Sequence, residues 1–100
     1  MVMCAYCGKA GAVNKDHVVP KARLANLIRE HALGVRKLDP LKNAPEWLFD
    51  TVPSCFACNM RKGPRLLVPP SWTKRISRLN RIGLGTFQVW DGGRVPEVIR

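Results

Sequence analysis

Four cysteines in two Cys-x-x-Cys pairs have the clearest chemistry in the sequence. The pairs are Cys4-Ala-Tyr-Cys7 and Cys55-Phe-Ala-Cys58, with 47 residues between them. Two such pairs can supply the four thiolates of a tetrahedral structural Zn²⁺ site. Two disulfides or thioredoxin-like redox chemistry are the alternatives. Because the first residues lack the pattern of a secretory signal, the sequence favours zinc held by Cys4, Cys7, Cys55 and Cys58.

A second set of residues could hold a hard metal ion and activate water. Asp16 offers a carboxylate of the kind that binds Mg²⁺ or Mn²⁺, and it stands next to His17. An imidazole can remove a proton from water near neutral pH. Asn59 follows the second cysteine pair and offers an amide oxygen, and Lys62 shares its helix face. We therefore expect a catalytic divalent site that leaves room for a phosphate oxygen.

The charge predicts a polyanionic partner. The 17 Lys and Arg residues exceed the seven Asp and Glu residues and give a net charge of +10. Nucleic acid is the default partner of such a domain, while an anionic membrane surface would need an amphipathic basic helix with bulky apolar anchors. No apolar run is long enough to cross a membrane. The candidates for contacts with DNA phosphates are Lys62, Lys74, Arg75, Arg78 and Arg81. A solvated side chain is the alternative for Lys62, and a solvated helix face is the alternative for the other four.

Short elements must position these residues. We expect strands over 13–19 and 50–54, which lead to His17 and to Cys55. Leu24, Leu27 and Ile28 recur at helical spacing and predict a helix over 21–33 that ends at Gly34. A helical turn is expected over 44–49, and a short helix after Cys55 that ends near 63–64. His31 is expected to be structural.

The last third of the chain predicts one more strand, one helix and a hairpin. The strand covers 66–68, and the helix covers 72–82 with its apolar residues Trp72, Ile76, Leu79 and Ile82 on one side. Segments 87–90 and 94–99 flank Asp91-Gly92-Gly93 and predict a C-terminal hairpin. Trp47, Trp72 and Trp90 are expected in the core. One hundred residues allow one α+β domain, 1–100.

In order and spacing, these motifs resemble the HNH nuclease family, the zinc-bound branch of the ββα-metal (His-Me finger) nucleases. The resemblance rests on Cys4-x-x-Cys7, Asp16-His17-x-x-Pro20 and Cys55-x-x-Cys58-Asn59-x-x-Lys62-Gly63, and covers 4–63. It implies a ββα-metal core with His17 on the first strand, Asn59 on the helix and one metal between them. It also implies that His17 activates water while Asp16 and Asn59 bind Mg²⁺ or Mn²⁺. Asp50 stands at the family's middle Asn position, and Asn43 is another polar candidate.

The resemblance implies a DNA endonuclease that nicks or cuts duplex DNA. Small stand-alone members of this kind resemble bacteriophage proteins, which implies action in the cytoplasm of a bacterial host. Because the core fills most of the chain and leaves only 69–100 beyond it, specificity is expected to be low or supplied by a partner. A junction-resolving endonuclease that acts as a dimer is one alternative, with the Leu24/Leu27/Ile28 helix as either its dimer face or part of the core. A non-catalytic zinc module is the other, but it leaves Asp16-His17 and Asn59 unexplained.

Overall fold

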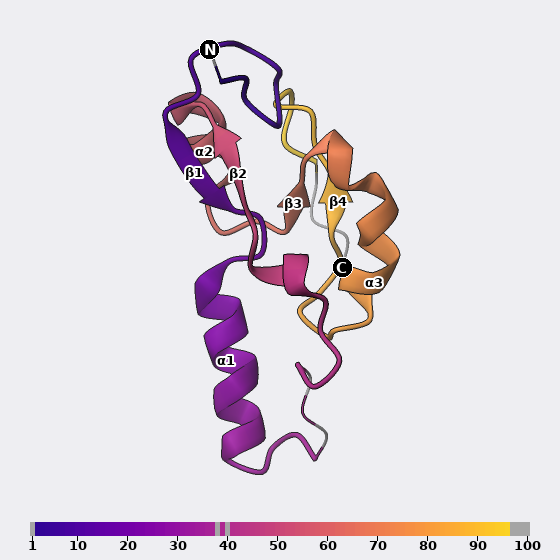
Figure 1. Ribbon diagram of the computed structural model, residues 1–100. Coiled ribbons are helices and arrows are strands. Elements are labelled where there is room, and N and C mark those ends of the chain that lie inside the picture. The colour runs from indigo at the N-terminus through magenta and orange to yellow at the C-terminus, as the bar shows by residue number, and fades with distance from the viewer. Residues whose placement is uncertain (1, 38, 40, 97–100) are drawn as a thin grey trace.

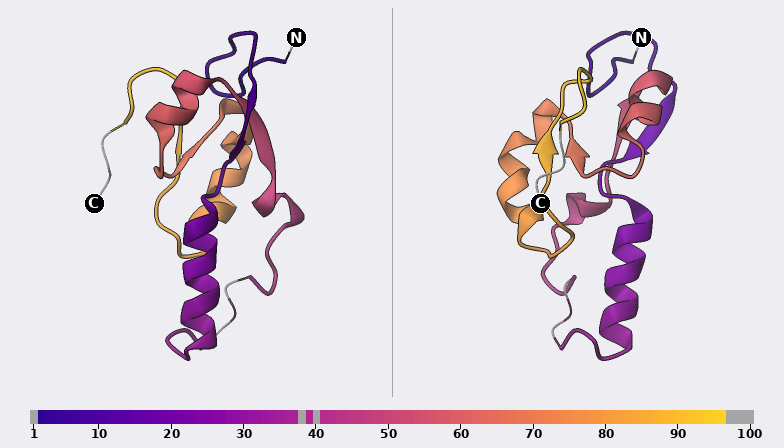
Figure 2. Two further views of the ribbon diagram at one scale, coloured as in Figure 1. Left: turned by 90° about the vertical axis from the view of Figure 1, so that its left-hand side faces the viewer. Right: turned by 180° about the vertical axis from the view of Figure 1, so that it is seen from behind.

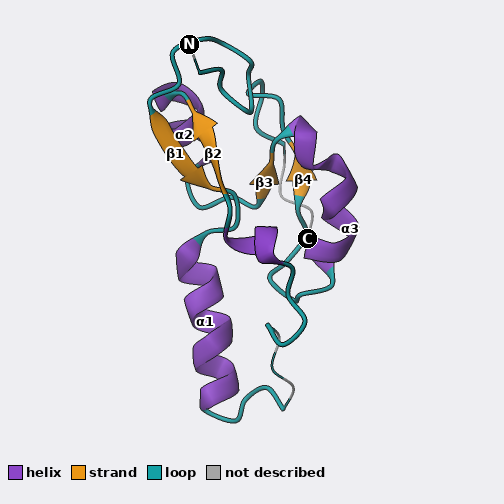
Figure 3. Cartoon of the chain, viewed as in Figure 1, coloured by secondary structure: helices purple, strands orange, loops and turns teal. Residues whose placement is uncertain are grey.

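A computed structural model describes residues 2–37, 39 and 41–96 of the chain, which form a small α+β fold (Figure 1). Two separate two-stranded sheets are present among these residues, one antiparallel (β1–β2) and one parallel (β3–β4). The elements in chain order are β1 (Asn14–His17), α1 (Lys21–Ala32), the 3₁₀ turn η1 (Glu46–Phe49), β2 (Thr51–Ser54), α2 (Phe56–Lys62), β3 (Leu67–Val68), the 3₁₀ segment η2 (Pro70–Arg75), α3 (Ile76–Asn80) and β4 (Gln88–Val89). Loops join most of them, and the first cysteine pair lies in a loop (Figure 3).

The first sheet brings together residues that are far apart in sequence. In its register Asp16 faces Val52 and His17 faces Thr51 across antiparallel strands. The expected strands are confirmed, with slightly shorter bounds than predicted. The segment between the strands forms α1 and a loop, and α1 projects away from the sheets in all three views (Figures 1 and 2). The described chain is accordingly elongated, 44 × 27 × 23 Å.

Helix α1 confirms the predicted helix but packs on the core only through its first half. Leu24 and Leu27 are buried, whereas Ile28 is 54% exposed. The helix ends at Ala32 with Leu33 as its C-cap, and Gly34 follows with a positive φ of 77° that most other residues avoid. The Leu24/Leu27 pair therefore belongs to the core, and the outer end of α1 leaves apolar side chains exposed.

Two apolar clusters hold the structure together. The larger one joins α1, η1, β3 and α3 through Val18, Val19, Leu24, Leu27, Leu48, Val68, Trp72, Leu79, Leu84 and Phe87. The smaller one surrounds the cysteines and includes Tyr6 and Trp90. Trp72 and Trp90 are buried and Trp47 is half-buried against Trp72 with an edge-to-face ring contact of 5.3 Å. The expected core role of the tryptophans is confirmed.

The predicted helix over 72–82 is divided into two parts. The Thr73 hydroxyl donates to the Pro70 carbonyl at 2.7 Å, and the Trp72 amide donates to Pro69. Such tight local bonds compete with α-helical pairing, so the segment begins as the 3₁₀ stretch η2 and becomes α-helical only at Ile76.

The predicted C-terminal hairpin is wrong. The segment 88–89 pairs in parallel with β3, because the amides of Gln88 and Trp90 donate to the carbonyls of Leu66 and Val68. The turn at Asp91 closes on itself, with the Gly93 amide donating to Asp91 Oδ1 at 3.0 Å. Residues 94–96 form no strand, and the rest of the expected second strand lies outside the described residues.

Candidate functional site

The four cysteines meet at one point of the structure. Their Sγ atoms all lie within 4.8 Å of one another, and Cys7 Sγ is 3.8 Å from Cys55 Sγ. Four sulfurs at about 2.3 Å from a tetrahedral Zn²⁺ would stand about 3.8 Å apart. A disulfide needs about 2.05 Å, and all four cysteines are free thiols. The cluster is therefore compatible with a metal such as zinc.

Local backbone structure builds each half of the cluster. Cys55 precedes α2, and its sulfur accepts a hydrogen bond from the Cys58 amide at 3.4 Å. On the other side, the Cys4 amide donates to Lys9 and the Gly8 amide donates to Cys4. Gly8 has a φ of 76°, which lets the turn curl back below the sulfurs. The Ala5 amide donates to Pro53, which joins this loop to β2.

The surroundings of Cys4 and Cys58 shift the pKa values of these two thiols in opposite directions. Burial raises the pKa of the Cys4 thiol, but backbone hydrogen bonds from Cys55, Cys7 and Tyr6 outweigh it and bring the pKa to about 6. The pKa of Cys58 is raised by burial and by its contacts with Cys55, Cys7 and Cys4. A second thiolate beside the first is thus disfavoured until a cation compensates both. This donor set fits Zn²⁺, which binds deprotonated sulfur.

The turn at Gly92 closes over the cysteine cluster. Gly92 is buried with a φ of 85°, and a Cβ there would lie 2.6 Å from Cys7 Cβ and 3.1 Å from Cys58 Sγ. Only glycine allows this approach. The sequence suggested a hairpin turn here and gave no sign of a contact with the cysteines, because 33 residues lie between Cys58 and Gly92.

Gly92→Ala is expected to weaken zinc binding about tenfold or more, because overpacking a dense site costs about 1–3 kcal/mol. Competition with a colorimetric zinc chelator measures it. Gly34→Ala is the matched control, since Gly34 has a similar φ of 77° but open space around its Cβ position. The control should lose stability through backbone strain and keep its zinc affinity. Equal zinc affinities for the two variants would contradict the close approach.

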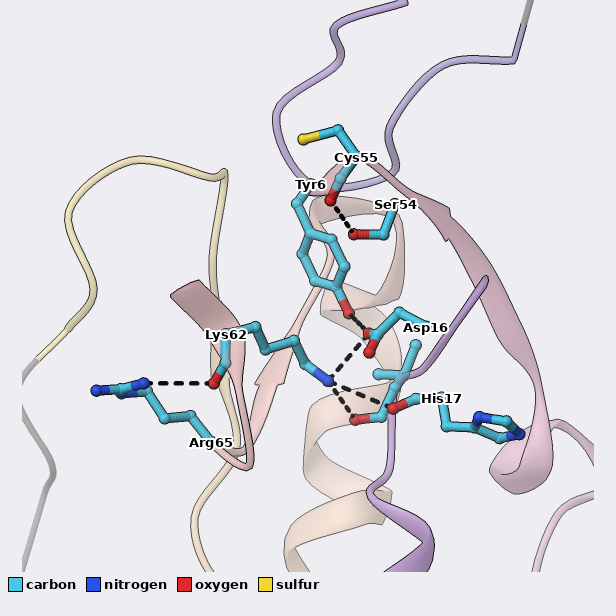
Figure 4. Close-up of polar contacts among 8 residues, drawn as sticks. Tyr6, Asp16, His17, Ser54, Cys55, Lys62 and Arg65 are labelled. Carbon is cyan, nitrogen blue, oxygen red and sulfur yellow. Dashed lines mark hydrogen bonds and ion pairs between the residues drawn. The ribbon is translucent and has the colours of Figure 1, made fainter. Parts of the chain in front are cut away.

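Asp16 is tied to two neighbours rather than open to solvent. Its Oδ2 accepts a hydrogen bond from the Tyr6 hydroxyl and an ion pair from Lys62 Nζ at 3.0 Å (Figure 4). Its Oδ1 makes no hydrogen bond to a described residue. Burial and the bond to Asp16 raise the pKa of Tyr6, so the phenol stays protonated and donates. Asp16 can therefore offer one oxygen to a metal while the other is held.

The expectation that Lys62 contacts DNA is wrong. Its side chain is 1% exposed, and its Nζ donates to the carbonyls of His17 at 3.4 Å and Val18 at 3.1 Å as well as to Asp16. An ammonium has three protons, so these three acceptors use all of them. Burial lowers the pKa of Lys62, and the adjacent Asp16 carboxylate opposes that shift.

His17 and Asp16 point to opposite faces of β1, as residues that alternate along a strand must. The His17 imidazole turns away from Asp16 and Lys62 (Figure 4). It is half-buried and makes no hydrogen bond to a described residue. Asp50 is exposed and precedes Thr51, the residue opposite His17, so it lies at the same end of the sheet. The structure thus places Asp50 near His17 in the β1–β2 register, and Asp16 with Tyr6 and Lys62.

Asn59 lies in α2, one turn before Lys62 and on the same helix face. Because Lys62 reaches β1, Asn59 stands on the side of α2 that packs toward that strand. Its side chain is half-buried and is not hydrogen-bonded to other described residues. Asn43, the other polar candidate, lies elsewhere: its carbonyl accepts a hydrogen bond from Arg78 at 3.3 Å.

The four basic residues of η2 and α3 differ in their surroundings. Lys74, Arg78 and Arg81 are exposed, and the two arginines line a groove of about 560 Å³ together with Lys42. Arg75 is different, since its guanidinium lies 4.8 Å from the Trp47 ring centre and 4.6 Å from that of Trp72. Nothing in the sequence indicated this packing against two indole rings, which gives Arg75 a structural role as well as its expected contact with phosphate.

His31 has the structural role that the sequence suggested. Its Nδ1 lies 3.1 Å from the Arg36 carbonyl, and Arg36 pairs with Glu30 at 2.7 Å. These contacts close the turn after α1. Tyr6, by contrast, was not singled out from the sequence, although its place inside the first Cys-x-x-Cys pair puts it next to any metal that the pair holds.

No family model, curated protein or solved structure matches the chain. The HNH resemblance therefore remains an interpretation of motifs. Within the described part of the chain, every helix is too short or too polar to cross a bilayer.

Proposed function

We propose that the chain is a DNA endonuclease that hydrolyses phosphodiester bonds with a divalent metal at the end of β1. One observation carries the proposal. Strand β1 pairs with β2, which leads into α2, although α1 and η1 separate the two strands in sequence; Asp16-His17 ends β1 and Asn59 lies on α2, which contacts β1. The four-cysteine cluster stands at the start of the same helix, where bound zinc would fix β2 and α2 to the N-terminal loop.

In this proposal His17 is the general base that removes a proton from the attacking water. The Asp16 Oδ1 and the Asn59 amide oxygen hold Mg²⁺ or Mn²⁺, whose chemistry when bound is to stabilise charge on the phosphoryl group and the leaving 3′ oxygen. In Figure 4 the imidazole points away from Asp16, so this role requires the side chain of His17, the last residue of β1, to turn past the end of the strand toward the metal. Catalytic contacts often tighten only when substrate binds. In this proposal the exposed Asp50 carboxylate, which lies at the same end of the β1–β2 sheet, orients the turned ring.

The net charge of +10 supports DNA as the substrate, and the exposed residues Lys74, Arg78 and Arg81 supply a phosphate-binding surface. Contacts from these side chains to phosphates would position the DNA backbone and carry no sequence information. Low sequence specificity follows, unless a partner protein supplies it.

Changing Arg78 and Arg81 together to Gln is expected to lower the slope of log K against log salt by about 1.8, since each lost phosphate contact removes about 0.9. Binding should weaken equally for all duplex sequences. Fluorescence anisotropy over a salt series measures the slope. Arg75→Gln is the comparison: it should reduce stability by about 0.5–2 kcal/mol through lost stacking and lower the slope by at most about 0.9, the effect of one phosphate contact. If the salt slope changed in Arg75→Gln but not in the double variant of Arg78 and Arg81, Arg75 rather than the pair would be the phosphate contact.

A junction-resolving endonuclease is the second candidate, and the projecting α1 favours it. Ile28 is 54% exposed on this helix, and Leu33 and Val35 just beyond it are each 72% exposed. Such apolar side chains fit a contact between two copies of the chain, which is how an enzyme would hold a symmetric branched substrate.

Cleavage of two substrates by zinc-loaded protein in Mg²⁺ tests the proposal. A linear duplex and a four-way junction of the same arm sequence are compared at equal concentration. Cleavage of the duplex at a rate similar to the junction is expected. Strong preference for the junction, with a dimer in sedimentation, would favour the second candidate. Binding of both substrates without cleavage of either would contradict the endonuclease proposal and indicate a non-catalytic zinc module.

A further inference from the structure

The end of β1 is held by a single buried ammonium. We propose that Lys62 is a positioning residue for the endonuclease reaction: it fixes Asp16 and the His17 backbone relative to Asn59. This inference rests on the proposed function, but the contacts that carry it do not. Figure 4 shows the Lys62 side chain reaching from the end of α2 to Asp16 and His17, and its Nζ also donates to the Val18 carbonyl.

All three protons of the ammonium go to three consecutive residues. Nζ lies 3.0 Å from Asp16 Oδ2, 3.4 Å from the His17 carbonyl and 3.1 Å from the Val18 carbonyl. Lys62 therefore bonds to each residue at this strand end, including the candidate metal ligand Asp16 and the candidate base His17. With 1% exposure, Lys62 has no surface left for DNA.

The same contacts orient the Asp16 carboxylate. Tyr6 and Lys62 both donate to Oδ2, from the N-terminal loop and from α2. Two donors from different directions leave the carboxylate little freedom to rotate, so the direction of Oδ1 is set as well. A metal held by Oδ1 would then meet a ligand already in place, which is the arrangement that supports fast chemistry.

Lys62 also sets the distance between the two elements that carry the metal ligands. Asn59 lies one turn earlier on the same face of α2, so the Lys62–Asp16 pair joins that helix to the strand of Asp16. Stability alone does not call for an ion pair here, because well-packed apolar side chains often replace buried pairs without loss. A role in geometry explains why an ammonium stands at this position.

The test compares Lys62→Met with Arg61→Met, its exposed neighbour on α2. For Lys62→Met, kcat at saturating DNA and Mg²⁺ should fall about 10²-fold, as expected when reacting groups shift by about 1 Å. KM for DNA and its salt dependence should stay at wild-type values. Arg61→Met should keep kcat. Zinc content and near-ultraviolet circular dichroism establish that each variant is folded.

A second variant keeps the test decisive if Lys62→Met does not fold. Tyr6→Phe removes the other donor to Asp16 Oδ2 and keeps the aromatic ring against Trp90. It should lower kcat with KM unchanged. A wild-type kcat in whichever of the two variants folds would overturn the proposal. So would a loss confined to KM with a smaller salt slope, because that result would mean that Lys62 contacts DNA.

A measurement without cleavage separates this inference from the proposed function. Amide hydrogen exchange of residues 17–19 and Mn²⁺-induced broadening of the Asn59 side-chain signal are recorded by NMR for wild type, Lys62→Met and Arg61→Met. Lys62→Met alone should speed the exchange and weaken the broadening. If wild type does not cleave DNA, the proposed function fails. The exchange rates and the Mn²⁺-induced broadening still test whether Lys62 positions Asp16 and Asn59, because neither depends on cleavage. Signals that are the same in all three proteins would overturn this positioning role.

Discussion

Replacing Cys55 by serine is expected to abolish the folded state of the chain. The change removes one of four sulfurs that lie within 4.8 Å of one another, and also the acceptor that caps α2 through the Cys58 amide. Structural zinc contributes about 10–16 kcal/mol of apparent binding energy in small domains. The stability of a whole domain is only about 5–15 kcal/mol, so most of the folding free energy depends on the metal.

Circular dichroism and elemental analysis of the purified variant measure this effect. Wild type should carry about one Zn²⁺ per chain, and Cys55→Ser should carry little zinc and lack a cooperative thermal transition. Met60→Ser is the matched control, because Met60 is a sulfur-containing residue on the same helix that is 65% exposed. It should keep both zinc and transition. A folded Cys55→Ser protein without zinc, melting at the wild-type temperature, would rule out the structural metal.

Replacing His17 by alanine is expected to lower the rate of DNA cleavage by about 10²–10⁴-fold, the usual effect of losing a general base. DNA affinity, zinc content and melting temperature should stay near wild type, because the imidazole is half-buried and hydrogen-bonds to no described residue. Single-turnover cleavage at saturating DNA isolates the chemical step.

The second histidine provides the control. His31→Ala removes the contact with the Arg36 carbonyl at the end of α1, so it should reduce stability and leave the chemical step unchanged. If His17→Ala cleaves at the wild-type rate in a preparation free of other nucleases, another group must activate the water. Asp50, at the same end of the β1–β2 sheet, would then be the next residue to change.

The parts of the fold that local sequence determines were predictable. Helical spacing of Leu24 and Leu27 with Gly34 behind them gave α1 almost to the residue. The spacing of the cysteines predicted a cluster, because a tight turn aims both sulfurs of a pair at one point. The sequence also indicated the strands that end near His17 and before Cys55, the helix between them and the short helix that carries Asn59.

Features that depend on burial or on distant segments were not predictable. A lysine at the end of a short helix looks solvated, and only the packing of α2 on β1 shows that Lys62 is buried and paired with Asp16. Arg75 belongs by pattern to a basic face, but Trp47 lies where its guanidinium can stack. The two residues of β4 carry too little sequence pattern to show which strand β4 pairs with. In the sequence Gly92 resembles any other glycine in a turn, and only the structure shows that it lies against Cys7.

The most direct test of the central claim is nicking of supercoiled plasmid by zinc-loaded protein over a series of Mg²⁺ concentrations. We predict that the supercoiled form is lost only with added Mg²⁺ or Mn²⁺, and that Asn59→Ala needs a higher concentration for the same rate while it keeps its zinc. Plasmid that is bound but stays supercoiled at every Mg²⁺ concentration would contradict the claim that this site hydrolyses DNA.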